Sequence, residues 1–183
     1  KMLLLAFENG GTADFHVLRE LAASLLEQGR IAEAEQYARG ALKIAPTNPY
    51  VLDILVACLI NKVRESPDDK GLDREAEEVL RRLIASDERE HKSFSHQRRI
   101  ALALARRDFD DARRLLERYK RHSEKVWYKG LKGEYLLRTG DARAALGELE
   151  HLRPEYEDMH EETVTEFGLV RRLRVLSFAD AGR

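Results

Sequence analysis

The first clear pattern along the chain is a pair of apolar stripes at helical spacing, separated by a glycine turn. Between residues 15 and 48 apolar positions recur every three or four residues, and Gly29 lies between the two stripes. Such spacing places apolar side chains on one face of a helix. We therefore predict one helix over about residues 14–28 and a second over about 31–45, which ends before Pro46.

Residues at the predicted helix ends carry capping signals. The side chain of Thr12 or Asp14 is suited to cap the first helix, because it accepts hydrogen bonds from backbone N–H groups that have no partner within the helix. Pro49 is favoured in a first helical turn, so it predicts the start of the next helix.

The same helix pair recurs along the chain. The turn at Gly29 has equivalents at Arg107 and Gly140, which are 33 residues apart. The step from Gly29 to Arg107 is 78 residues, which fits two steps of 35 residues if the second repeat holds eight extra residues. Residues 64–71 are rich in Pro, Asp and Gly, so we predict that the eight residues form a loop. The predicted repeats span residues 15–48, 49–91, 92–125 and 126–156.

The two ends of the chain lie outside these four pairs. Residues 1–13 form an N-terminal segment with a short apolar stretch. Residues 157–178 have the spacing of an amphipathic helix, which we interpret as a cap over the last apolar face. The alternative is the first helix of a fifth repeat.

The helix pair resembles the tetratricopeptide repeat, a helix–turn–helix unit of 34 residues. The resemblance rests on the packing residues of the first repeat, which are Leu18, Leu21, Leu25, Ala34, Ala38, Ala41 and Pro46. It implies an all-α fold over residues 14–178: a right-handed alpha-alpha superhelix, or solenoid, of about four repeats plus the capping helix. Leu18 stands where the family carries an early Trp.

The resemblance also implies a concave groove, which family members use to hold an extended peptide or a partner's helix. Mapped onto this chain, the groove residues are His16, Arg19, Tyr50, Asp53, Asn61, Phe94, Gln97, Trp127 and Lys129. Aromatic anchors with a few hydrogen-bonding groups suit a peptide site. The three aromatic residues are equally suited to ordinary packing between helices. The paired Lys and Asn residues with which one subfamily binds chaperone C-termini are not matched, so we do not expect that ligand.

Charge is balanced over the whole chain but not locally. The chain has 32 Lys and Arg against 33 Asp and Glu, which does not favour nucleic acid or a membrane as partner. Residues 98–132 carry a local net charge of +7, and residues 133–166 carry −7. The basic stretch is either a binding patch for an acidic partner or nucleic acid, a solvated helix face, or a surface that contacts its acidic neighbour. We favour the last two.

Candidate chemistry is sparse. Three Glu-x-x-His pairs, of the kind that some di-iron proteins use, occur at Glu88/His91, Glu148/His151 and Glu157/His160. A repeat array does not bring such pairs around one core, so we expect no bound metal. No phosphate-binding loop or nucleophile elbow is present, and we predict neither a cofactor nor an enzymatic activity. Cys58 lies in an apolar run, which is typical of a small buried side chain.

These observations favour a protein–protein interaction module that binds a peptide or protein segment and acts as a scaffold or adaptor. The alternative is a sensor or oligomerisation domain of a larger regulatory protein, such as a signalling NTPase or a transcriptional regulator, which the non-Met start suggests. Self-association is a further option. With one cysteine the chain cannot form an internal disulfide, which fits a reducing compartment. The sequence shows no signal-peptide core and no membrane-spanning run, so we predict a cytoplasmic location.

Overall fold

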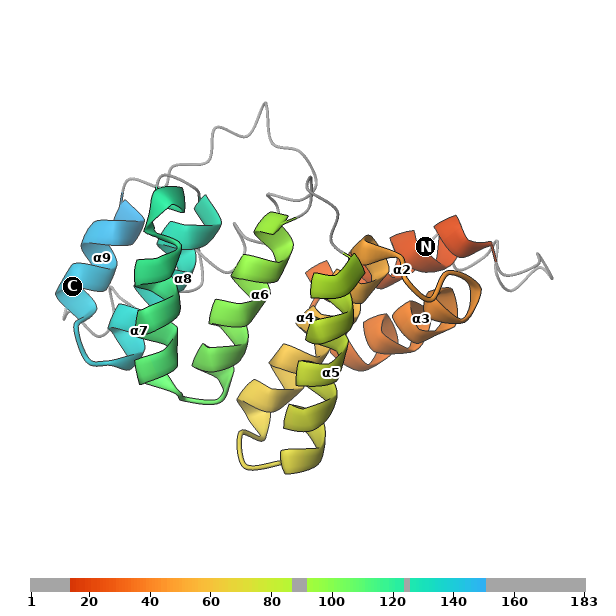
Figure 1. The fold of residues 1–183 in the computed structure, drawn as a ribbon, viewed down its shortest axis with the longest axis horizontal. Helices are drawn as coiled ribbons and strands as arrows, with labels where there is room; N and C mark the ends of the chain where they lie inside the picture. The colour runs from red at the N-terminus through yellow and green to blue at the C-terminus, as the bar shows by residue number, and fades with distance from the viewer. Residues whose placement is uncertain (1–13, 87–91, 124–125, 151–183) are drawn as a thin grey trace. The chain divides into compact units, whose positions relative to one another are not determined.

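The computed structural model describes residues 14–86, 92–123 and 126–150 (Figure 1). Within these ranges the chain is all-α, as predicted, with eight α-helices, one short 3-10 helix and no strand. The helices are α2 (Phe15–Glu27), α3 (Ile31–Ile44), α4 (Pro49–Glu65), α5 (Lys70–Ser86), α6 (Lys92–Ala105), α7 (Phe109–Arg118), the 3-10 helix η1 (Lys120–His122), α8 (Val126–Arg138) and α9 (Ala142–Glu150). The predicted N-terminal segment and the predicted capping helix lie outside the described residues.

The chain divides into two compact units, Lys1–Arg98 and Arg99–Arg183. The boundary falls within α6, so the first unit contains α2 to α5 and the start of α6. The second unit contains the rest of α6 and the helices from α7 to α9. The single continuous array over residues 14–178 stays a prediction.

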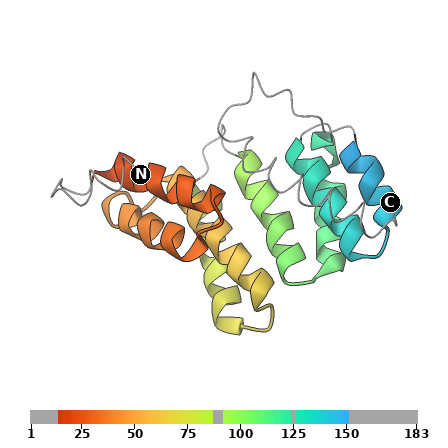
Figure 2. The same cartoon turned by 180° about the vertical axis from the view of Figure 1, so that it is seen from behind.

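Helices α2 and α3 form the first helix pair, and their ends agree with the predicted ends to within one residue. Figure 2 shows the two helices side by side. Asp14 caps α2, because its Oδ1 accepts the N–H of His16 at 2.9 Å. Ala22 on α2 and Ala34 on α3 are fully buried, as expected for small residues where two helices approach closely.

The predicted equivalence of the turns at Gly29, Arg107 and Gly140 is confirmed. All three residues have a positive φ, at 74°, 60° and 90° respectively. At each turn the N–H of this residue binds the carbonyl three positions earlier, at 3.0–3.2 Å, and the next N–H binds the carbonyl five positions before itself, at 2.8–3.0 Å. These two bonds make the Schellman motif, which ends a helix by satisfying its last carbonyl groups.

The second helix pair differs in part from the prediction, because only residues 66–69 of the predicted loop 64–71 lie outside the helices. Helix α4 continues to Glu65 and α5 begins at Lys70. Gly71 is therefore the second residue of a helix, and it has no positive φ. The Oδ1 of Asp69 accepts the N–H groups of Gly71 at 2.8 Å and of Leu72 at 3.1 Å, so Asp69 caps the start of α5.

The eight extra residues of the second pair lengthen its helices. If Leu25 is aligned with Leu59 and Ala34 with Ala76, four residues are added to the end of α4 and three to the start of α5. The remaining residue lengthens the connection. Because one helical turn holds 3.6 residues, about one added turn in each helix keeps the same faces packed together.

Helix α4 forms the centre of the first unit. Every residue from Val51 to Ile60 is buried, and α4 packs against α2, α3 and α5. Cys58 is fully buried in this run, and burial raises the pKa of its thiol to about 12. The thiol is therefore protonated at neutral pH and packs as a small apolar side chain, as predicted.

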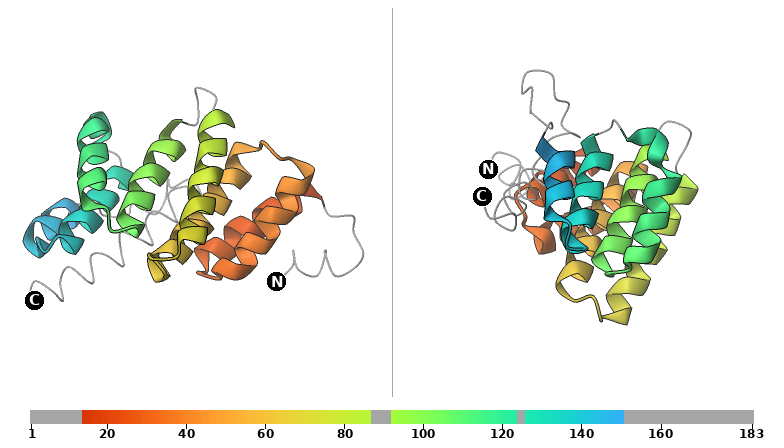
Figure 3. Two further views of the ribbon diagram at one scale, coloured as in Figure 1. Left: turned by 60° about the horizontal axis from the view of Figure 1, so that its bottom comes forward. Right: turned by 90° about the vertical axis from the view of Figure 1, so that its left-hand side faces the viewer.

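In the second unit α8 packs against α7 and α9. The right-hand view of Figure 3 shows α8 and α9 side by side. Gly133 on α8 allows their close approach, since a Cβ atom there would lie 2.8 Å from a methyl group of Leu149. The hydroxyl of Tyr128 donates to the carbonyl oxygen of Leu116 at 2.9 Å and so links α8 to α7.

Within the described ranges, no helix combines the length and the apolar character that a bilayer crossing requires.

Candidate functional site

Two of the predicted groove residues, Arg19 and Tyr50, lie next to each other in the first unit. His16 and Arg19 are three residues apart on α2 and therefore share a face of that helix. The guanidinium carbon of Arg19 lies 6.0 Å from the centre of the Tyr50 ring on α4. Tyr50 is 39% exposed and, with Ile44 at 51%, is one of two exposed large apolar residues in the described ranges. An accessible tyrosine ring beside a guanidinium group is a common anchor of protein interfaces.

Asp53 lies one turn after Tyr50 and makes a bidentate ion pair with Arg98. The Nε and Nη2 atoms of Arg98 donate to the two carboxylate oxygens of Asp53, each at 2.7 Å. Both side chains are largely buried, so the pair joins α4 to the start of α6. The carboxylate of Asp53 is thus engaged within the first unit by the guanidinium group of Arg98.

Asn61 and Gln97 are the other predicted groove residues of the first unit whose side chains the structure describes. The Nδ2 of Asn61 donates to the carbonyl oxygen of Ala57 at 2.9 Å, one turn back along α4. Asn61 is half-buried, and Gln97 on α6 is buried. Phe94 lies in α6, but its side chain is outside the described part of the chain.

We define the α2/α4 face as the surface formed by His16, Arg19, Tyr50, Asp53 and Asn61. Its accessible groups are His16, Arg19 and Tyr50, while Asp53 supports it from within. Arg19 also donates from Nε to the carboxylate of Glu20 at 2.9 Å. The face therefore offers an aromatic ring, a compensated guanidinium group and an exposed imidazole.

Arg98 was not among the predicted site residues, although its partner Asp53 was. The signal lay in α4, where Asp53 is the single charged residue in a run that is otherwise apolar from Val51 to Ile60. A buried carboxylate needs a cation or several donors. The spacing within one helix cannot identify a cation 45 residues away.

The remaining predicted site residues lie in the second unit. Trp127 is only 8% exposed, and its ring centre lies 5.5 Å from that of His122 and 5.9 Å from that of Tyr128. These contacts match the packing interpretation of Trp127. Lys129, two residues later on α8, is half-buried.

A second charged cluster links three helices of the first unit. The carboxylate of Glu35 on α3 binds Arg39 at 2.7 Å and the Nζ of Lys62 on α4 at 3.0 Å. Arg39 also binds Glu75 on α5. Burial raises the pKa of Glu35, but its hydrogen bonds with Arg39 and Lys62 outweigh burial and hold the pKa below its ordinary value. The cluster is a structural link with its charges compensated.

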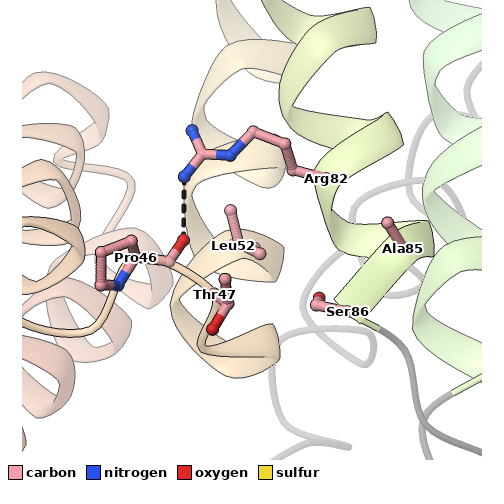
Figure 4. A pocket seen from close by; sticks show the side chains of 6 residues that line it. All are labelled: Pro46, Thr47, Leu52, Arg82, Ala85 and Ser86. Carbon is pink, nitrogen blue, oxygen red and sulfur yellow. Dashed lines mark hydrogen bonds between the residues drawn. The ribbon is translucent and has the colours of Figure 1, made fainter.

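A hollow of about 480 Å³ lies beside the connection between α3 and α4 (Figure 4). Its lining residues are Pro46, Thr47, Leu52, Arg82, Ala85 and Ser86. The Nη2 of Arg82 donates to the carbonyl oxygen of Pro46 at 2.9 Å, and the hydroxyl of Ser86 donates to that of Leu83 at 2.9 Å. Because the side chains of Arg82 and Ser86 already bind backbone carbonyls, we assign no ligand to this hollow.

The described residues contain no group of three or more His, Cys, Asp or Glu side chains that is able to hold a metal ion. Of the three Glu-x-x-His pairs, only Glu148 lies within the described ranges. It forms an ion pair with Lys132, which links α9 to α8.

Comparison of the chain with protein-family models, with curated proteins and with solved structures gave no significant match. The functional proposal therefore rests on the geometry of the chain itself.

Proposed function

We propose that the protein is a tetratricopeptide-like interaction module that binds an extended peptide segment of another protein across the α2/α4 face. The observation that carries the proposal is the cation–π pair of Arg19 and Tyr50, which remains accessible on an otherwise well-packed helical unit. Tyrosine and arginine are among the residues that contribute most to binding energy at protein interfaces.

Two features of the first unit support this proposal. The Asp53–Arg98 pair holds the start of α6 against α4 within the first unit, so this part of the unit is ordered before a partner arrives. Preorganisation lowers the entropic cost of binding. The charges of the face are compensated by Glu20 and Arg98, which favours a partner recognised by shape and aromatic contact over a highly charged one.

The repeat organisation supports the same proposal. The three Schellman turns with matching hydrogen bonds indicate a helix pair used repeatedly, and helical repeats commonly offer one helix of each pair to a ligand. The scaffold or adaptor role follows from the peptide-binding proposal.

Selection from a random-peptide library displayed on phage tests the proposal, followed by titration of a selected peptide into purified variants. Tyr50→Ala should weaken binding by about tenfold or more, because truncation of a central aromatic anchor commonly costs about 2 kcal/mol. Tyr50 is partly exposed, so the variant should retain its helical circular dichroism.

Ile44→Ala is the matched control, because Ile44 is the other exposed large apolar residue and lies on α3. Its affinity for the selected peptide should equal that of the wild type. The proposal is wrong if the library yields no binding peptide, or if Ile44→Ala weakens binding as much as Tyr50→Ala does.

A further inference from the structure

The C-terminal end of α7 and the adjoining 3-10 helix η1 carry a dense group of exposed cations. Five of the ten residues from 113 to 122 are Lys or Arg, against one acidic residue, Glu117. We define the α7 basic end as Arg113, Arg114, Arg118, Lys120 and Arg121, which are all exposed. The side chain of Arg114 is 74% exposed, and that of Lys120 is 72% exposed.

The ion pairs at the α7 basic end are local and weak. Arg113 lies 3.6 Å from Asp110, Arg114 lies 3.1 Å from Asp111, and Lys120 lies 4.0 Å from Glu117. Each pair spans three residues of the chain and is solvated, and such pairs contribute little to stability. A partner that supplies better-placed carboxylates can therefore replace them at low cost.

Among the described residues, Arg118 and Arg121 each contact an aromatic side chain. The guanidinium carbon of Arg118 lies 5.8 Å from the centre of the Tyr119 ring. The Nε of Arg121 donates to Nε2 of His122 at 3.2 Å. These contacts orient the two arginines without neutralising them.

Three basic side chains of the first unit have a different role. Arg39, Lys62 and Arg98 each bind a carboxylate on another helix and so hold the unit together. At the α7 basic end the Arg113 and Arg114 pairs lie within α7, and the Lys120–Glu117 pair links η1 only to the adjoining end of α7. One favourable role inside the protein is compensation of the helix dipole, which accounts for Arg118 in the last turn of α7. Arg113 and Arg114 lie a turn earlier, beyond that effect.

Three acidic residues of the neighbouring stretch 133–166 have partners within the second unit. Glu134 on α8 binds Arg138 at 3.0 Å, and Glu148 binds Lys132. The Oδ1 of Asp141 accepts the N–H of Ala144 at 2.9 Å and so caps α9. The sequence left open a contact between the basic and acidic stretches, and the Lys132–Glu148 pair is one such contact between them.

We infer that the α7 basic end is a second interaction surface, which binds a short acidic peptide segment of a partner protein. Carboxylates match the guanidinium groups in charge and in bidentate geometry. A longer polyanion such as duplex DNA fits less well, since Asp108, Asp110 and Asp111 lie at the other end of the same helix and would repel its phosphates. The near-neutral net charge of the chain adds no long-range attraction to nucleic acid.

Fluorescence anisotropy with a labelled peptide of alternating Glu and Gly residues tests this inference on the full chain. The peptide should bind at low ionic strength and dissociate as salt is added, because exposed charges are screened. Arg118→Gln combined with Arg121→Gln should weaken binding by about tenfold, as expected for the loss of two exposed charge contacts. Thermal melts of the double variant should match those of the wild type to within a few degrees, because both side chains are exposed.

Arg81→Gln on α5 is the matched control. Arg81 is an exposed arginine with an (i, i+3) partner, Glu78, and it belongs to the first unit. Its substitution should leave the affinity for the acidic peptide unchanged. Equal weakening by Arg81→Gln would contradict the inference, and so would tight binding of the corresponding Gln-Gly peptide. Absence of binding by the acidic peptide, or tighter binding of duplex DNA, would also overturn it.

Discussion

Arg107 adopts a backbone conformation that glycine adopts at the two equivalent turns. Its φ is 60°, whereas Gly29 and Gly140 have φ values of 74° and 90°. A left-handed conformation costs an L-residue with a Cβ atom about 1–2 kcal/mol. Glycine avoids this cost. It loses more conformational freedom on folding, however, which destabilises the folded state by about 0.5–1 kcal/mol.

Arg107→Gly should therefore stabilise the protein by roughly 0.5–1 kcal/mol, measured as a higher midpoint of urea unfolding. Gly29→Ala should have the opposite effect, with a loss of about 1 kcal/mol. Nothing lies within 4 Å of a Cβ atom built at Gly29, so that variant reports backbone conformation without a steric clash. Unchanged stability in both variants would show that the turns do not depend on the left-handed residue.

Arg107 also shows what residue types alone could predict. The interval between repeats identified position 107 as the turn, although glycine was absent there. The positive φ of an arginine could not be predicted from its own preference. It follows from the hydrogen bonds of the turn, which tie Arg107 to Leu104 and Asp108 to Ala103.

At the scale of the helices, the packing of α8 against α9 depends on a residue without a side chain. A Cβ atom at Gly133 would lie 2.8–3.1 Å from three side-chain carbons of Leu149, which is fully buried and has little room to move. Alanine favours the helix by about 1 kcal/mol over glycine, but the clash should outweigh this gain.

Gly133→Ala should thus destabilise the protein by about 1–3 kcal/mol in urea unfolding, through overpacking. Gly147→Ala on α9 is the control, because no atom lies within 4 Å of a Cβ atom at this exposed site. It should stabilise the protein by up to about 1 kcal/mol through helix propensity. If Gly133→Ala proves as stabilising as Gly147→Ala, the described packing of α8 on α9 is incorrect.

The Glu35 cluster makes the link between α3, α4 and α5 dependent on pH. The folded-state pKa of Glu35 lies below its ordinary value, so folding favours the ionised form. This contribution is fully present above the unfolded-state pKa of about 4.3 and is lost as pH falls through the folded-state pKa.

Glu35→Gln should cost about 1–2 kcal/mol of stability at neutral pH, because it weakens a half-buried ionic cluster. The difference from wild type should shrink as the pH of the urea titration is lowered below 4. Glu33→Gln serves as the comparison, since Glu33 pairs with Arg30 in an exposed position and should have little effect at any pH. A Glu35→Gln difference that stays constant between neutral and acidic pH would exclude the proposed linkage.

The second helix pair shows how sequence reasoning succeeds and fails at the scale of elements. Apolar spacing located α4 and α5, and turn composition located the break between them. The predicted loop was too long. Residues 64, 65, 70 and 71 were assigned to it because they adjoin residues typical of turns, but they belong to the two helices. Adding a turn to each helix keeps their packing faces in register and satisfies more backbone groups than a long loop would.

At the scale of the whole molecule, the candidate site depends on contacts that span long intervals of the chain. The repeat pattern placed Arg19 and Tyr50 on equivalent helices, and the structure brings them together. It did not predict Arg98, nor that Trp127 is buried among His122 and Tyr128. Tertiary packing determines which side chains are exposed. A periodic pattern can therefore identify candidate aromatic residues, but it does not show whether they are exposed binding residues or buried core residues.

The two interaction surfaces proposed lie in different units and have different chemistry. The α2/α4 face combines an aromatic ring with compensated charges, while the α7 basic end combines solvent-exposed guanidinium groups with weak local ion pairs. They therefore fit different segments, in keeping with an adaptor that contacts more than one sequence. The two proposals are tested independently, because the variants used in the two experiments have no residue in common.

The most direct test of the central claim is a map of backbone amide chemical-shift changes when a library-selected peptide is added to isotopically labelled protein. We predict that the largest changes fall on residues 16–23 of α2 and 50–61 of α4, and that Tyr50→Ala abolishes them. Changes confined to α3 and α5, or to α7 and η1, would contradict the assignment of the α2/α4 face as the peptide site.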